Sequence, residues 1–125
     1  MTNIPITTAA CSTILNNGNE VIRINPSKGL EYSKDNGRNW HLRKANSSNY
    51  GEFKDLLVYG TEILIISAKG LYYSKDGCSN LHLRKAQSTS YGFFVSLANA
   101  GGELLVTTTN GLYYSRDGGC NLHRR

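Results

Sequence analysis

The sequence has few prolines, no long apolar run and no cysteine pairing pattern, and these absences exclude several classes of protein. No apolar run approaches the roughly 18 residues that a membrane-spanning helix needs. The 3 cysteines, Cys11, Cys78 and Cys120, are odd in number and lack a C-x-x-C pair, which argues against a disulfide framework or a zinc site. Proline is limited to 2 residues, whereas glycine reaches 13 and tyrosine 8, which is typical of short strands joined by tight turns. No segment has a sustained helical period.

The segment Thr8-Ala9-Ala10-Cys11 has the form of a lipoprotein cleavage site but lacks the basic and apolar regions that precede one. We therefore expect a cytoplasmic protein without a membrane partner, with non-classical secretion as the open alternative. The net charge of +5 favours acidic partners such as nucleic acid or anionic glycans. No long Lys/Arg block is present, so an ordinary soluble surface is the simpler interpretation.

A segment of seven residues recurs three times and dominates the sequence. Residues 29–35 recur at 70–76 and 111–117, a spacing of 41 residues each time. The match continues downstream, because His41-Leu42-Arg43-Lys44-Ala45 recurs from His82 and again, in shorter form, from His123. The 125 residues therefore predict one domain of three repeats, at about 9–45, 50–86 and 91–125.

Each repeat contains four strand-like runs. In the middle repeat these are residues 53–59, 62–67, 71–74 and 81–86, and the apolar run 63–66 predicts a strand buried on both faces. The corresponding runs are 10–15, 20–24, 30–33 and 40–45 in the first repeat, and 93–98, 103–108, 112–115 and 121–124 in the third. Alternation places Trp40 and Leu42 on one face and His41 and Arg43 on the other. Four short strands in about 40 residues match the size of a propeller blade.

The segment Ser33-Lys34-Asp35-Asn36-Gly37-Arg38-Asn39-Trp40 resembles the Asp-box, or BNR, motif Ser-x-Asp-x-Gly-x-x-Trp of sialidase-like β-propellers. The second copy has Cys78 for glycine and Leu81 for tryptophan, and the third has Leu122 for tryptophan. The resemblance implies a turn between the third and outermost strands of each blade, with serine and aspartate accepting backbone N–H groups. The predicted structural residues are Ser33, Asp35, Gly37, Trp40, Ser74, Asp76, Ser115, Asp117 and Gly119.

Three blades do not close a ring, and an open arc leaves its end sheets without neighbours. The predicted fold is therefore all-β, with three four-stranded antiparallel blades per chain forming half of a six-bladed β-propeller. A second copy would complete the ring by homodimerisation. Three copies would give nine blades, a rarer ring.

The resemblance to sialidases raises the question of glycosidase activity, but we expect no enzyme. Sialidases combine an arginine cluster with a tyrosine nucleophile and acidic partners, and three near-identical blades supply few unique groups. We therefore predict no catalytic residue, no cofactor and no metal. His41, His82 and His123 occur once per blade, too far apart to share an ion. Cys78 and Cys120 are expected to be tolerated in their turns, with thiols open to solvent.

The repeat favours binding, and three classes stay open: a protein-interaction scaffold, a multivalent carbohydrate-binding lectin, and a polyanion- or nucleic-acid-binding protein. An aromatic platform with nearby arginine or asparagine would suit a sugar. The candidate ligand-binding residues are Tyr32, Tyr73, Tyr114, Arg43, Arg84, Asn39, Asn80 and Asn121. The alternative roles are structural: tyrosines packed between sheets, and the Arg43-Lys44 and Arg84-Lys85 pairs protecting exposed strand edges.

Overall fold

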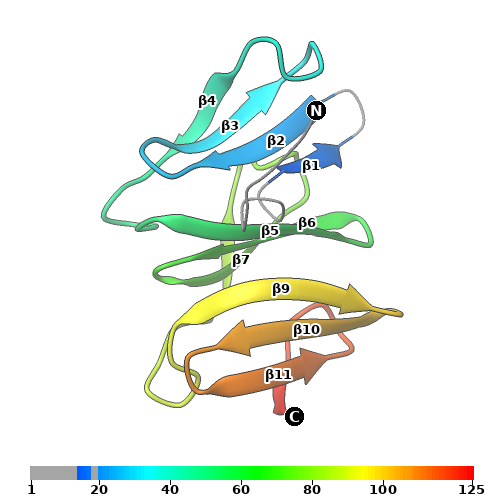
Figure 1. Ribbon diagram of the computed structural model, residues 1–125. Helices are drawn as coiled ribbons and strands as arrows, with labels where there is room; N and C mark the ends of the chain where they lie inside the picture. Colours follow the sequence, from blue (N-terminus) through cyan, green and yellow to red (C-terminus); the bar gives the residue numbers. More distant parts are fainter. Residues whose placement is uncertain (1–13, 18–19) are drawn as a thin grey trace, which may run out of the picture.

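The computed structural model describes residues 14–17 and 20–125 and shows three four-stranded antiparallel sheets (Figure 1). Each sheet follows chain order, so neighbouring strands are joined by simple hairpins. The first sheet contains β1 (Ile14–Asn17), β2 (Glu20–Asn25), β3 (Gly29–Ser33) and β4 (His41–Ala45). The second contains β5 (Phe53–Tyr59), β6 (Glu62–Ser67), β7 (Gly70–Ser74) and β8 (His82–Ala86). The third contains β9 (Phe94–Ala100), β10 (Glu103–Thr108), β11 (Gly111–Ser115) and β12 (His123–Arg124).

The predicted strand pattern is confirmed, with small shifts at the boundaries. β5, β6 and β10 have the predicted bounds, and most other strands begin or end within two residues of the prediction. The first predicted strand, 10–15, falls partly on residues 10–13, which lie outside the described residues. Among the described residues no helix is long and apolar enough to cross a membrane.

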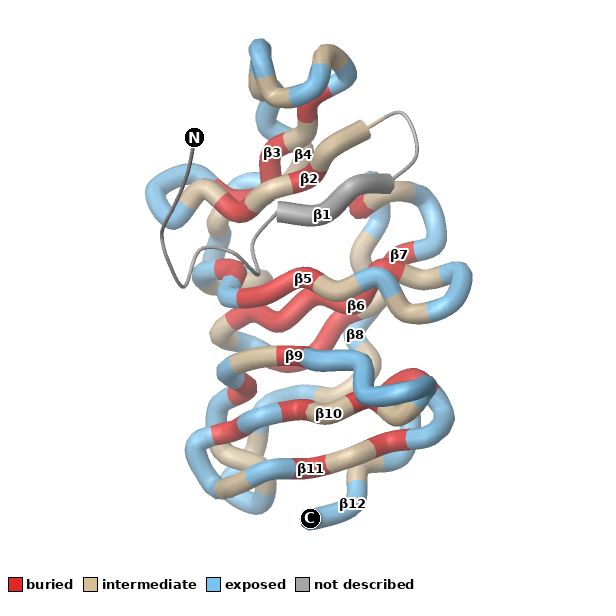
Figure 2. The backbone as a smooth tube through the Cα atoms, turned by 45° about the vertical axis from the view of Figure 1, so that its right-hand side comes forward, coloured by how far each residue is buried: buried red, intermediate tan, exposed pale blue. Residues whose placement is uncertain are grey.

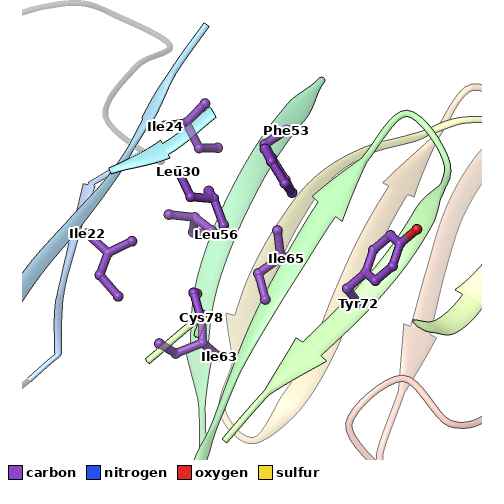
Figure 3. Packing of buried hydrophobic residues seen from close by; sticks show 9 residues of the cluster. All are labelled: Ile22, Ile24, Leu30, Phe53, Leu56, Ile63, Ile65, Tyr72 and Cys78. Carbon is purple, nitrogen blue, oxygen red and sulfur yellow. The ribbon is translucent and has the colours of Figure 1, made fainter. Parts of the chain in front are cut away.

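The sheets pack face to face, with their innermost strands closest together. β5 lies against β1 on one side and β9 on the other, and β6 also contacts β9 (Figure 2). Two apolar clusters fill the two junctions. The first joins Ile22, Ile24 and Leu30 to Phe53, Leu56, Ile63, Ile65, Tyr72 and Cys78 (Figure 3). The second joins Leu64, Ile66 and Leu71 to Phe94, Leu97, Leu104, Val106 and Tyr113.

β6 is buried on both faces, as its apolar run predicted. Ile63 and Ile65 belong to the first cluster, whereas Leu64 and Ile66 belong to the second. Alternate side chains of one strand therefore hold the middle sheet to both neighbours. Each of these fully buried side chains contributes about 1.5–3 kcal/mol relative to exposure.

The predicted alternation along residues 40–43 is confirmed, because His41 and Arg43 both pack on Tyr32, whereas Trp40 packs on Arg23 on the other face. The outer strand of the sheet also carries a bulge. Leu30 pairs with Lys44 but Glu31 pairs with Leu42, so Arg43 is the extra residue. Leu42 is 51% exposed, and the Arg43 side chain enters the junction between the first and second sheets. The same shift occurs between Leu71 and Tyr72 in the second sheet.

In the first and second sheets, the glycine that opens the repeated Gly-Leu pair lies against the bulged outer strand. Gly70 has φ +153° and lies directly beneath the outer strand. A Cβ at this position would lie 2.3 Å from the Lys85 carbonyl oxygen. Because this oxygen belongs to the backbone, no side-chain movement can relieve the clash. Gly29 faces the Lys44 carbonyl oxygen in the same way, so glycine at 29 and 70 is a packing requirement of the sheet, whereas the nearest atoms at Gly111 belong to the Arg124 side chain.

Candidate functional site

Three Ser–Asp turns, residues 33–40, 74–81 and 115–122, join the third and fourth strands of the sheets. In the second turn the Ser74 hydroxyl donates to Asp76 Oδ1 at 2.7 Å and accepts from the Cys78 N–H at 2.9 Å. Asp76 in turn accepts from the Asn80 backbone N–H at 2.9 Å and from its side-chain amide at 2.6 Å. The first and third turns repeat this network with Ser33, Asp35, Gly37, Asn39, Ser115, Asp117, Gly119 and Asn121.

The turn donors stabilise the ionised form of each aspartate. Hydrogen bonds from Asn80 and Ser74 lower the pKa of Asp76 to about 2. Those from Ser115 and Asn121 lower the pKa of Asp117 to about 2, and those from Ser33 and Asn39 hold the pKa of Asp35 well below its usual value. These carboxylates are ionised at neutral pH and engaged by the turn, which suits a structural role better than proton transfer.

An arginine of β4 links the first sheet to the second. Arg43 makes a bidentate pair with Glu20, at 2.6 and 2.9 Å, and donates to the Gly77 carbonyl oxygen of the next Ser–Asp turn at 2.8 Å. Its guanidinium carbon also lies 3.8 Å from the Tyr32 ring centroid. The hydrogen bonds between the two side chains lower the pKa of Glu20 and raise the pKa of Arg43. The edge-protection role expected for Arg43 is therefore wrong, because its side chain is only 13% exposed and bridges two sheets.

Arg84 repeats the arrangement between the second and third sheets. It pairs with Glu62 at 2.7 and 3.0 Å, donates to the Gly118 carbonyl oxygen at 3.0 Å and lies 3.9 Å from the Tyr73 ring centroid. The edge-protection role expected for Arg84 is wrong for the same reason.

The remaining candidate aromatic and asparagine residues are also engaged in local contacts. Tyr32, Tyr73 and Tyr114 each pack against the histidine of the neighbouring strand, with ring centroids 5.4, 5.2 and 5.3 Å apart. Asn39, Asn80 and Asn121 donate to the aspartates of the turns. His41, His82 and His123 are exposed. The described residues contain no group of three metal-ligating side chains.

The two cysteines of the turns differ, which corrects the expectation that both are exposed. Cys120 is exposed, but Cys78 is fully buried in the first cluster. Cys78 has φ 71°, in the left-handed region, where the other turns have Gly37 and Gly119. Burial raises the pKa of its thiol to about 12, so it is a poor nucleophile. Cys11 lies outside the described residues.

Trp40 and its leucine counterparts lie at the edges of the sheets' apolar faces. Leu81 packs against the first cluster and Leu122 against the second. Trp40 is half-buried, and the Arg23 guanidinium carbon lies 4.1 Å from its ring centroid. Trp40 therefore covers the Arg23 guanidinium group rather than a junction between sheets.

An apolar hollow of about 410 Å³ opens between the second and third sheets. Phe93 is 52% exposed there and Val95 45%, an unusual exposure for such residues. Lys54 of β5 is the charged residue of the hollow's lining, and no described carboxylate forms an ion pair with it. The hollow is lined by Lys54, Ala68, Phe93, Phe94, Val95 and Thr109.

No family model and no curated protein matches the chain. Solved structures do match: YCF48 bound to D1 peptide has a TM-score of 0.66 at 19% sequence identity, over 93% of this chain and 42% of that chain. YCF48 is a β-propeller. The fold is a β-propeller. An ancestral GH74 enzyme also matches, with a TM-score of 0.67 at 16% identity, over 90% of this chain and 17% of that chain. Each sheet is thus one blade, and the chain spans less than half the length of either protein.

Sequence reasoning missed three functional features of this propeller. The Arg–Glu pairs were overlooked although a signal was present, because Glu20, Glu62 and Glu103 recur at the start of each second strand. Asp55 was also missed: it is buried and accepts a hydrogen bond from the Leu97 N–H of the next blade at 2.7 Å. The hollow left no repeated signal, since residue 93 is phenylalanine where the preceding blade has Glu52.

Proposed function

We propose that the chain is a non-catalytic β-propeller that binds a partner through the hollow beside Phe93. The observation that carries this proposal is the combination of an exposed apolar surface with a lysine that no described carboxylate neutralises. An apolar group next to a negative charge complements both features. The occupant we infer is a peptide that carries an apolar side chain beside a carboxylate, and YCF48, a propeller with a similar fold, is bound to a peptide.

The repeated positions give less support to the other binding classes. A lectin with one equivalent site per blade would use the recurring tyrosines, but Arg43 and Arg84 cover Tyr32 and Tyr73. A polyanion site would use the recurring arginines, and both of these are already paired with glutamates. The hollow, in contrast, occurs at the second junction, and Phe93 is replaced by Glu52 at the first.

Two further elements complete the proposal. We infer that the Ser–Asp turns are Asp-box turns, and the Ser33 hydroxyl and the Asp35 carboxylate, which accept from the turn N–H groups, support this inference. The binding module is a six-bladed ring made of two chains. No glycosidase chemistry is proposed, since the turn aspartates are held ionised by their own turns.

Fluorescence titration with 1-anilinonaphthalene-8-sulfonate, an aromatic anion, tests the hollow. Phe93→Glu copies the residue of the preceding blade, removes the ring and repels the anion, so we expect at least about tenfold weaker binding. Lys54→Gln should weaken binding less and reduce its dependence on salt. Val58→Thr is the matched control, since Val58 lies on β5, the strand of Lys54, is 42% exposed and does not line the hollow.

Wild-type affinity in Phe93→Glu would show that the hollow is not the binding site. Hydrolysis of a fluorogenic aryl sialoside by the purified chain would overturn the non-catalytic assignment. These two outcomes concern the ligand and the chemistry separately.

A further inference from the structure

Each internal junction of the propeller is built from the same two halves. The preceding blade supplies an arginine and a leucine, and the following blade supplies the third and fourth residues after the serine of its Ser–Asp turn. At the first junction Arg43 donates to the Gly77 carbonyl oxygen, and Leu30 and Cys78 belong to the same apolar cluster. At the second junction Arg84 donates to Gly118, and a Cβ on Gly119 would lie 2.8 Å from Leu71 Cδ2.

The third blade carries an unused arginine half. Arg125 pairs with Glu103, and its guanidinium carbon lies 4.5 Å from the Tyr114 ring centroid. Arg43 and Arg84 make the same two kinds of contact, each with a glutamate and a tyrosine of its own blade. Its side chain is nevertheless 46% exposed, against 13% and 12% for Arg43 and Arg84. Leu112 is 38% exposed, whereas its counterparts are fully buried.

The first blade carries the complementary unused turn. Asn36 has φ 62°, close to the 70° and 75° of Gly77 and Gly118, so its carbonyl is held by a turn of the same shape. Asn36 is exposed and Gly37 half-buried, whereas Cys78 and Gly119 are buried by the preceding blade. Asparagine tolerates this left-handed conformation better than most residues.

We propose that a second copy of the chain inserts its Asn36-Gly37 turn against Arg125 and Leu112, and that the reciprocal contact closes the ring. The inference rests on the two-chain ring of the proposed function but not on the ligand of the hollow. Both halves are preformed, because Arg125 is oriented by Glu103 and the turn by the Ser33 and Asp35 network. Little ordering is therefore needed when the copies meet.

The end faces are more polar than the internal junctions, and this sets the character of the contact. On the third blade, Thr107 occupies the strand position that Ile66 has in the second blade. On the first blade, Arg23 and Glu31 occupy the positions of Ile65 and Tyr72, and they form an ion pair at 2.8 Å. Less apolar area is buried per junction, so each is weaker than an internal one. Two identical junctions in a twofold ring reinforce each other, and we expect a reversible, concentration-dependent dimer.

Disulfide trapping tests this geometry. The variant combines Gly37→Cys with Leu112→Cys, in a chain with Cys11→Ser and Cys120→Ser; the buried Cys78 is kept. Gly37→Cys copies the cysteine that the second blade already has at this turn position. We expect oxidation to yield a covalent species of twice 13.8 kDa on a non-reducing gel. The matched control combines Leu71→Cys with Gly119→Cys, which should form a disulfide within one chain.

The outcomes separate cleanly. A dimer from the double variant, and from neither single variant, supports the ring. No intermolecular disulfide, while the internal control closes, overturns the proposal, and a ladder of larger polymers overturns the two-copy ring in favour of an open array.

Sedimentation of the unlinked protein gives an independent measurement should the cysteine variant fail to fold. Arg125→Ala is expected to raise the dimer dissociation constant at least about tenfold. It should destabilise the dilute monomer less than Arg84→Ala does, because Arg125 is 46% exposed and Arg116 also pairs with Glu103. A wild-type chain that stays monomeric at millimolar concentration would overturn the closure. Loss of anilinonaphthalene sulfonate binding in Phe93→Glu does not bear on either result, so failure of the ligand and failure of the ring are distinguishable.

Discussion

Replacing Arg84 by alanine should destabilise the junction between the second and third blades. The change removes a bidentate pair with Glu62, a hydrogen bond at 3.0 Å to the Gly118 carbonyl oxygen and a stacking contact with Tyr73. It also leaves the Glu62 carboxylate, whose side chain is 16% exposed, without its cation. Removing one partner of a buried pair costs 3–5 kcal/mol, and this pair is partly screened, so we expect a loss of about 2–4 kcal/mol.

The assay is urea unfolding followed by tyrosine fluorescence, at a concentration where the chain is monomeric. Lys85→Ala is the matched control, since it removes the adjacent cation, which forms no ion pair with a described carboxylate. Its cost should stay below about 0.5 kcal/mol. Equal midpoints for the two variants would refute the bridging role of Arg84.

The pH dependence offers a second test of the same pair. Hydrogen bonding to Arg84 lowers the pKa of Glu62 in the folded state. The stabilisation is therefore present above the unfolded pKa of about 4.3 and is lost as the pH falls through the folded value. Unfolding curves of the wild type should converge with those of Arg84→Ala as the pH falls below about 4, and a constant gap would contradict the linkage.

Two further predictions concern the Ser–Asp turns. Asp76→Ala should cost about 1–2 kcal/mol, because it removes the acceptor for Asn80 and Ser74, and an unchanged melting temperature would argue against the structural role. The same stabilisation should be present above about pH 4 and be lost as the pH falls towards the folded pKa of about 2, which acid titration by circular dichroism measures. Iodoacetamide should modify Cys120 rapidly and Cys78 only on unfolding, since Cys78 is buried with its thiol pKa raised to about 12. Mass spectrometry of the native protein gives the ratio, and equal labelling would contradict the burial.

The strands were predictable because their signal is local. The alternation along residues 40–43 and the apolar run of β6 depend on adjacent residues, and the repeat provided three copies of the strand pattern. The bulge beneath Leu42 was not predictable in this way, because it depends on the register between β3 and β4. Arg43 lies on the same face as His41, as the alternation predicted, but that this face meets the next blade depends on how the sheets pack, and Arg43 is therefore a bridge between blades rather than an edge residue.

The candidate site was harder to predict for a related reason. A repeat directs attention to positions that recur, and the recurring tyrosines and asparagines are used by the fold itself. The hollow depends on Phe93, which departs from the repeat, and on Lys54 of the preceding blade. The hollow forms because two blades pack against each other, and an alignment of the repeats gives no information on that packing.

The arginine bridge has a consequence for how such a chain can grow. Arg43 and Arg84 hold the next blade by a backbone carbonyl, an atom that every amino acid supplies. The residue that follows this carbonyl is cysteine in one blade and glycine in the other, and the bridge tolerates both. A newly duplicated blade is therefore compatible with its neighbours before any side chain has adapted. Gene duplication can lengthen the arc, and a residue that departs from the repeat, such as Phe93, distinguishes one blade from its neighbours.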